Sequence, residues 1–356
     1  MTDLAPAQRA PLLALGFAGL IVGVLAGLWR LGWPTPALAA GAPHGVLMMC
    51  AFFGTLIGLE RAVAIGRRWA YLGPLAGGIG SALLIAGVDA RAACAAFLLT
   101  GGVLVAASVH AQRLQNVLHA KVLTLGAAVW LAGVVVWGAS GSVVWAQWWW
   151  LGFLVFTIAG ERLELSRLVR VSPAMTRLFV AILALLLAAT VLAAWPAGGR
   201  LYGLALVALA LWLLRQDVAR RTVKGTGLTR YIAVCLLAGY AWLAIGGLLL
   251  AAQAPLPGVP GWDAALHAIV VGFVFSMVFG HAPIILPAVL RLKVPYHWGF
   301  YLPLTLLHLS LVVRVGAGLA DHFALRADGA LGNAIAIGAF LLMQVFTIAA
   351  ARRAAA

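Results

Sequence analysis

The chain has 356 residues, of which 64% are hydrophobic and only 9% are charged, and its formal net charge at pH 7 is +15. This composition lies far outside the range of soluble globular domains and indicates a membrane protein. The basic residues lie between apolar segments, a distribution typical of membrane topology, so we expect no nucleic-acid partner.

Apolar stretches of helical length recur along the whole chain. A helix that crosses the hydrocarbon core of a bilayer needs about 20 mostly apolar residues. The pattern predicts an all-α polytopic protein in the lipid bilayer, with residues 1–356 forming a single integral membrane domain. In chain order, the expected twelve spans are 11–29, 43–61, 71–88, 92–110, 121–139, 143–161, 175–195, 200–215, 230–251, 263–289, 299–317 and 330–350.

The basic residues are distributed unevenly between the two ends of these spans. If the N-terminus is cytoplasmic, nineteen of the 24 Lys and Arg residues fall on the cytoplasmic side. The five exceptions are Arg30, Arg91, Arg200, Arg314 and Arg326. Cytoplasmic loops of membrane proteins are enriched in Lys and Arg. We therefore expect a bacterial-type cytoplasmic (inner) membrane protein with both termini in the cytoplasm.

A repeated spacing marks the inner ends of the second, sixth and tenth spans. In each, a phenylalanine precedes an ionisable residue by eight positions: Phe52 and Glu60, Phe153 and Glu161, Phe273 and His281. A mark on every fourth span predicts three pseudo-symmetric four-helix units at 1–120, 121–228 and 229–356. The alternative is chance, because Phe and Gly are common in membrane helices.

Two histidines lie near the outer starts of predicted spans, His44 in the second and His267 in the tenth. Ionisable residues at membrane depth are costly and are candidates for function. Two imidazoles on parallel helices can ligate one haem iron, although histidines at helix starts also occur in the polar interface without a ligand. Arg314 in the eleventh span needs an anionic partner, which is a haem propionate, Asp263 or Asp321. Asp263 can also orient the ring of His267.

A second group of ionisable residues is expected at the inner ends of the spans, where the repeat places Glu60, Glu161 and His281, with Glu164 one turn beyond Glu161. Two carboxylates and an imidazole suit a metal site or a cluster that handles protons. The alternative is ion pairing of the acids with nearby arginines. In a regular α-helix, His281 would lie about 21 Å from His267 and within about 40° of it around the axis.

The motifs at residues 43–49 (PHGVLMM) and 267–273 (HAIVVGF), together with twelve spans, resemble the NnrS family. These are membrane proteins that contain haem, are reported with copper and are linked to nitric oxide metabolism. More distantly, the layout resembles subunit I of haem–copper oxidases. The resemblance implies that His44 and His267 ligate haem b and that Arg314 pairs with a propionate. The oxidase pattern also has a copper-binding histidine trio, whereas this chain has Glu161 and Glu164 in the sixth span.

The resemblance therefore implies a haem b protein of nitric oxide or redox metabolism that performs electron transfer, nitric oxide binding or nitric oxide reduction. As an enzyme it would be a haem-dependent oxidoreductase resembling nitric oxide reductase, with a quinol or cytochrome as electron donor. A second metal, non-haem iron or copper, would be held by Glu60, Glu161, Glu164 and His281. The alternative function is a cofactor-free proton- or ion-coupled transporter, in which Glu60, Glu161 and His281 couple protons.

Overall fold

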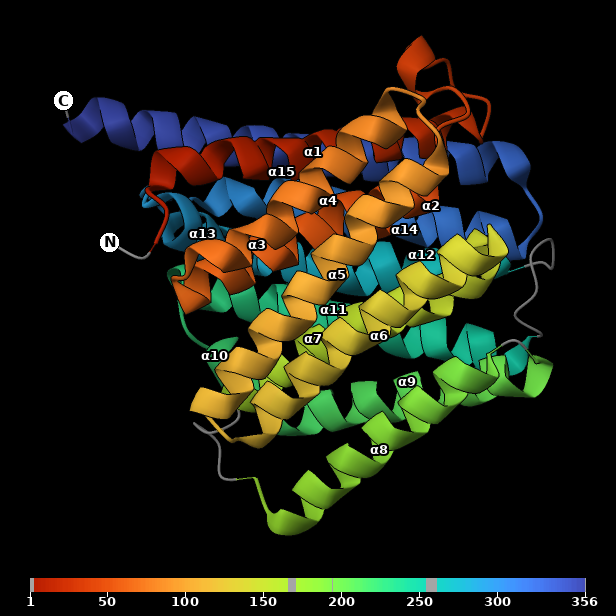
Figure 1. Cartoon of the computed structure of the whole chain (residues 1–356). Coiled ribbons are helices and arrows are strands. Elements are labelled where there is room, and N and C mark those ends of the chain that lie inside the picture. Colours follow the sequence, from red (N-terminus) through yellow and green to blue (C-terminus); the bar gives the residue numbers. More distant parts are fainter. Residues whose placement is uncertain (1–2, 166–170, 194, 254–260, 356) are drawn as a thin grey trace. The chain divides into compact units, whose positions relative to one another are not determined.

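The computed structural model describes residues 3–165, 171–193, 195–253 and 261–355, and all regular secondary structure in these ranges is helical (Figure 1). The longer helices are α1 (Pro6–Trp29), α5 (Ala90–Leu114), α6 (Leu118–Ser140), α7 (Val143–Leu165), α8 (Pro173–Leu192), α9 (Pro196–Gln216), α11 (Gly227–Ala252), α14 (Tyr301–Leu319) and α15 (Phe323–Ala355). Shorter helices are α2 (His44–Val46), α3 (Thr55–Ile65), α4 (Leu72–Ile85), α10 (Ala219–Thr222), α12 (Trp262–His267) and α13 (Phe275–Leu290). The predicted all-α fold is confirmed.

Eleven helical stretches in the described ranges are long and apolar enough to cross a membrane, and they coincide with eleven of the predicted spans. The remaining predicted span, 71–88, contains α4, which has 14 residues. At about 1.5 Å per residue such a helix is roughly 21 Å long, shorter than the hydrocarbon core of about 30 Å. The polytopic membrane fold is thus confirmed, whereas the number of crossings and the side on which the termini lie stay predictions.

The chain divides into two compact units. Unit 1 comprises Met1–Gly160 with Ala288–Arg291, and unit 2 comprises Glu161–Pro287 with Leu292–Ala356. Each unit contains parts of several predicted four-helix repeats, so the repeats at 1–120, 121–228 and 229–356 stay a prediction.

In unit 1, α4 packs closely against its neighbours because glycines replace larger residues on its surface. A Cβ atom added at Gly77 would lie 2.5 Å from Oγ1 of Thr55 in α3, and one added at Gly78 would lie 2.7 Å from Cδ1 of Leu15 in α1. Small residues let helix backbones approach in membranes, where van der Waals packing drives association. The glycine-rich sequence of α4 therefore explains why a short helix is fixed among longer ones.

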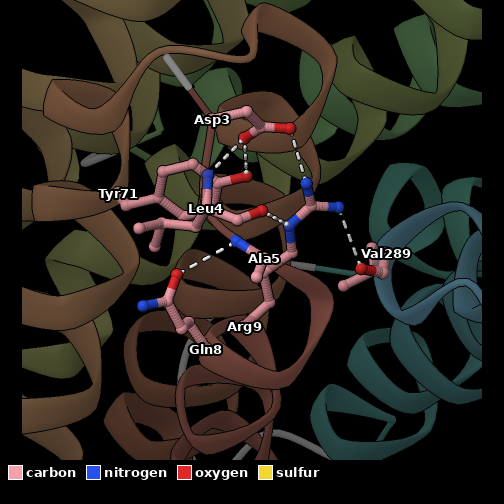
Figure 2. A network of polar contacts seen from close by, with 7 residues as sticks. All are labelled: Asp3, Leu4, Ala5, Gln8, Arg9, Tyr71 and Val289. Carbon is pink, nitrogen blue, oxygen red and sulfur yellow. Dashed lines mark hydrogen bonds and ion pairs between the residues drawn. The ribbon is translucent and has the colours of Figure 1, made fainter. Parts of the chain in front are cut away.

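The N-terminal anchor of unit 1 is a polar network around Arg9, whose side chain is buried (Figure 2). Nε of Arg9 donates to the carbonyl of Leu4 (3.0 Å), Nη1 donates to the carbonyl of Val289 (3.1 Å), and Nη2 binds the carboxylate of Asp3 (2.5 Å). The Tyr71 hydroxyl donates to the other oxygen of Asp3 (2.7 Å). The anchor thus joins α1, the segment before α4 and the end of α13.

In unit 2, close helix contacts also depend on glycine. Gly203 of α9 faces Gly247 of α11, and a Cβ added at Gly203 would lie 2.4 Å from the carbonyl oxygen of Gly247. Helices α14 and α15 are joined by a polar contact, in which the amide of Asn333 donates to Oγ of Ser310 (2.7 Å) and to the carbonyl of Leu307 (3.2 Å). These contacts fix α11 and α14, which carry side chains of the candidate site.

The second and tenth predicted spans share an α–π–α course. In unit 1, α2 is followed by a π-helix, η2 (Leu47–Gly54), and then by α3. In unit 2, α12 is followed by a π-helix, η5 (Ala268–Val274), and then by α13. The two π segments begin at Leu47 and Ala268. These two residues are as far apart in the sequence as Phe52 and Phe273, the phenylalanines of the repeated spacing. π-Helices are rare and frequently lie at functional sites.

Each π segment has a glycine on which a tryptophan of another helix packs. A Cβ added at Gly54 would lie 2.5 Å from Cζ2 of Trp130 in α6, and one added at Gly272 would lie 2.4 Å from Cγ of Trp242 in α11. The indole of Trp130 also donates to the carbonyl of Met49 inside η2 (3.1 Å). The backbone irregularity is therefore held by tertiary contacts.

The π segment corrects the expected geometry between His267 and His281. The expected distance and angle assumed a regular α-helix, but η5 lies between the two residues and closes its hydrogen bonds over five residues instead of four. The α-helical estimate therefore does not apply to this span. Beyond His281, α13 continues through Pro283 and Pro287 to Leu290, so neither proline ends the helix.

Candidate functional site

His44 begins α2, and its half-buried ring points toward α1. Its Nδ1 lies 2.6 Å from the carbonyl oxygen of Gly23. Because a carbonyl oxygen accepts hydrogen bonds, Nδ1 carries a proton and donates it to Gly23. A Cβ added at Gly27 would lie 2.9 Å from Nδ1 and Cε1 of the ring, so this glycine makes room for the imidazole. In metal-binding histidines, the nitrogen that does not bind the metal commonly donates to a backbone carbonyl in the same way.

His267, at the end of α12, forms a triad with Asp263 and Arg314. Nε and Nη2 of Arg314 donate to the two carboxylate oxygens of Asp263, at 3.0 and 2.9 Å. Nδ1 of His267 lies 2.8 Å from the backbone carbonyl of Asp263 and 3.2 Å from its carboxylate. Nη2 of Arg314 also lies 3.0 Å from Nε2 of His267. Since a guanidinium can only donate, Nε2 accepts, and the ring is neutral with its proton on Nδ1.

The triad answers the question of the anionic partner of Arg314. Of the three partners considered from the sequence, the structure shows Asp263, whose two carboxylate oxygens both accept hydrogen bonds from the guanidinium in a bidentate pair. Asp321 is exposed and has a left-handed backbone conformation with φ of 56° at the end of α14. The expectation that Asp263 orients the His267 ring is confirmed by the contacts to Nδ1. Pairing with a propionate stays a prediction.

His281, on α13, repeats the hydrogen-bond pattern of His267. Its Nδ1 lies 2.7 Å from the carbonyl oxygen of Met277, four residues earlier, and its Nε2 lies 2.9 Å from Nη2 of Arg162 in α7. The same reasoning makes His281 neutral, with the proton on Nδ1 and Nε2 accepting from the arginine. The two histidines of the tenth span thus each have an arginine in front of Nε2.

His308, in the middle of α14, links two helices. The indole of Trp242 donates to its Nδ1 at 3.0 Å, which leaves the proton on Nε2. Nε2 is buried and has no hydrogen-bond partner within the described residues. This contact is a hydrogen bond between helices α11 and α14 in which the imidazole accepts. With its lone pair used by Trp242, His308 is not arranged as a metal ligand.

The acids of the expected inner cluster are divided between the units. Glu60 is half-buried in unit 1, whereas unit 2 contains Glu161, which is half-buried, and Glu164, which is exposed. Within the described residues, no group of three or more His, Cys, Asp or Glu side chains is placed to hold a metal ion. The second-metal site at Glu60, Glu161, Glu164 and His281 stays a prediction, as does a haem ligand pair of His44 in unit 1 and His267 in unit 2.

Two polar groups near this region were not anticipated from the sequence. Asp217 is buried and accepts a hydrogen bond from the hydroxyl of Tyr240 in α11 (2.7 Å) and another from the backbone N–H of Ala219 (2.7 Å). The sequence did contain a signal for Asp217, because an acidic residue stands directly after the apolar stretch that ends at Gln216. The role of Trp242, which contacts both Gly272 of η5 and His308, depends on tertiary packing and left no local signal.

Comparison with known proteins places the chain in a family. A family model described as "Domain of unknown function (DUF8744)" matches residues 9–349, which include all of the candidate site residues described above. The comparison with curated proteins gave no match. Because the family model covers nearly the whole sequence, the chain belongs to the DUF8744 family.

Proposed function

We propose that this protein binds haem b in the membrane and acts in nitric oxide or redox metabolism, and that His44 and His267 would hold the haem. The observation that supports this proposal best is the orientation of His44, which donates its Nδ1 proton to the carbonyl of Gly23, as metal-binding histidines commonly do with the nitrogen that does not bind the metal. The imidazole ring of His44 fits beside Gly27 because glycine has no Cβ atom. Oriented imidazoles of this kind are suited to axial coordination of haem iron.

His267 supports the proposal on one condition. Its Nδ1 proton is held by Asp263, which orients a metal-binding histidine and increases its basicity. Its Nε2, however, accepts from Arg314 in the structure. Coordination through Nε2 therefore requires that Nη2 of Arg314 leaves this nitrogen, while the pair of Arg314 with Asp263 or a propionate keeps the guanidinium charge compensated.

A bound haem would supply reversible one-electron chemistry and an iron that can bind nitric oxide. We therefore propose electron transfer, nitric oxide binding or nitric oxide reduction as its role, with a quinol or cytochrome as electron donor. A second metal at Glu60, Glu161, Glu164 and His281 is a separate proposal. For His281 it requires that Arg162 moves from Nε2, in the same way as Arg314 at His267.

The proposal is tested by absorption spectra of the detergent-purified protein, oxidised and then reduced with dithionite, after expression with added haem precursor. We expect a Soret band and sharp α and β bands on reduction, with haem b identified as its pyridine complex. His44→Ala and His267→Ala should each lose most of the bound haem, because each removes an axial ligand. His322→Ala is the matched control, because His322 is exposed after α14, and this variant should keep the wild-type haem content.

Intact haem content in His267→Ala would contradict the ligand assignment. A colourless wild-type protein would contradict haem binding itself and favour the second candidate, a cofactor-free proton- or ion-coupled transporter. The observation that favours this candidate is the contact of buried Arg162 with half-buried His281, which lies in a span with a π segment and two prolines, since ionisable residues at membrane depth mark ion and proton pathways.

A further inference from the structure

Three arginines in the described part of the chain are buried, Arg9, Arg162 and Arg314, with exposed fractions of 2%, 4% and 8%. A buried charge is costly unless an opposite charge and hydrogen bonds compensate it. Arg9 is paired with Asp3, and Arg314 is paired with Asp263. Arg162 forms no ion pair with a carboxylate of the described residues, and its hydrogen-bond partner is the neutral ring of His281.

The Arg314 triad shows how a carboxylate compensates the charge of a buried guanidinium and accepts its hydrogen bonds. Its Nε and Nη2 point in parallel and form a fork that holds both oxygens of Asp263, while Nη2 also reaches Nε2 of His267. Bidentate pairs of this geometry are among the strongest hydrogen-bonded contacts, because two parallel N–H groups match two oxygens of a planar anion.

Arg162 has the same arrangement without the carboxylate. Its Nη2 lies 2.9 Å from Nε2 of His281, as Nη2 of Arg314 lies 3.0 Å from Nε2 of His267. Each of these histidines directs Nδ1 to the carbonyl four residues before it, Met277 or Asp263. Nε of Arg162, however, is buried and has no hydrogen-bond partner in the described ranges. The fork of Arg162 therefore lacks the anion that Asp263 provides to Arg314.

The described groups near Arg162 do not supply this anion. The hydroxyl of Tyr240 is close enough for the charge of Arg162 to act on it, but this hydroxyl donates to Asp217. The second carboxylate oxygen of Asp217 accepts from the backbone of Ala219. Asp217 is thus engaged by two donors of its own and forms no ion pair with Arg162.

We propose that the Nε–Nη2 fork of Arg162, with His281 beside it, is a binding site for a small planar monoanion with two adjacent oxygens, such as a short carboxylate or nitrite. The anion takes the place that Asp263 occupies at Arg314, accepts from Nε and Nη2, and compensates the buried charge. His281 keeps the guanidinium in position through its Nε2 lone pair. This site needs no haem and goes beyond the proposed function.

The test uses the full chain purified in detergent and radiolabelled formate as the probe in equilibrium dialysis. We expect saturable binding of about one formate per chain, because one fork takes one bidentate anion. Nitrite should displace the formate, and chloride at the same ionic strength should displace it far less, because a spherical ion cannot fill both positions of the fork. Displacement by formate analogues but not by nitrite would assign the site to carboxylates, and the reverse preference would assign it to nitrite.

Arg162→Gln should weaken formate binding at least tenfold, and Arg162→Lys should weaken it nearly as much, because lysine keeps the charge but lacks the fork. Arg221→Gln is the matched control, since Arg221 is exposed in the same unit, and its affinity should equal that of the wild type. The proposal is wrong if the wild type shows no saturable binding, if chloride displaces formate as well as the better of the two planar anions does, or if Arg162→Lys retains full affinity. Should Arg162→Gln fail to fold, the wild-type competition and Arg162→Lys decide the question.

Discussion

The N-terminal anchor around Arg9 and the triad around Arg314 are both buried arginine–aspartate pairs, but they differ in their other partners. The remaining donors of Arg9 bind the backbone carbonyls of Leu4 and Val289, which hold chain segments together. The remaining contact of Arg314 is to the Nε2 lone pair of His267, a side chain that can bind a ligand. An arginine that donates to backbone carbonyls stabilises the fold. An arginine that donates to an imidazole nitrogen also competes with any ligand for that nitrogen.

The two aspartates also differ in exposure, and this difference predicts the size of their effects. The side chain of Asp3 is 35% exposed and that of Asp263 is 26% exposed, while the side chains of Arg9 and Arg314, taken without their backbone atoms, are 3% and 10% exposed. Asp263 binds its arginine through both oxygens, so its removal leaves more of the arginine without compensation. The following predictions use this contrast, from the largest expected effect to the smallest.

Asp263→Asn should destabilise the protein most strongly. It leaves the buried guanidinium of Arg314 without a counter-charge, and breaking a buried pair by removing one partner typically costs about 3–5 kcal/mol. The measurement is the free energy of unfolding in mixed micelles, compared with the wild type. Stability within about 1 kcal/mol of the wild type, the range of an exposed pair, would mean that the triad is solvated like a surface ion pair.

Asp3→Asn should have a smaller effect in the same assay. Arg9 keeps its bonds to the carbonyls of Leu4 and Val289, and Asp3 is partly open to water, so we expect a loss of roughly 1–3 kcal/mol, as for one charged hydrogen bond. Haem content, if the proposed function holds, should not change, because the anchor has no candidate ligand. A loss as large as that of Asp263→Asn would remove the distinction between the two pairs.

Tyr71→Phe tests the pH dependence of the anchor. Burial and the hydrogen bond to Asp3 raise the pKa of Tyr71 above its ordinary value of about 10. The neutral phenol is favoured in the folded state, so its stabilisation is fully present below pH 10 and is lost as the pH rises through the folded pKa. The variant should lose about 1 kcal/mol near pH 8. This gap should narrow above pH 10, and a gap that stays the same between pH 8 and pH 12 would contradict the raised pKa of Tyr71.

The membrane fold could be predicted from the sequence because hydropathy is a sum over many residues and tolerates local errors. The pairing of Asp263 with His267 was also within reach, since residues four apart lie on one helix face. The length of α4 was not, because the apolar segment at 71–88 continues past the end of the helix. The stop is set by Ala86 and by Gly87, which has a positive φ of 70°.

The partner of Arg162 could not be predicted. The sequence places Arg162 next to Glu161, which favours a local ion pair, whereas the structure directs it to His281, 119 residues away. Such contacts depend on how whole helices are rotated against each other. The π segments are a similar case, because the tryptophans that pack on Gly54 and Gly272 come from α6 and α11, far along the chain.

The π segment η5 also determines how the rest of its span is rotated around the helix axis. A π-helix accommodates an extra residue in the course of an α-helix, so deletion of one residue from Ala268–Val274 would restore regular α-helical winding and leave the following residues on the same face. If the same residues wound instead as a regular α-helix with none removed, everything after the segment would turn by about 100° around the helix axis relative to His267. His281 would then leave Arg162, although neither residue had changed. The rotational register between the two histidines is thus encoded by the apolar residues between them.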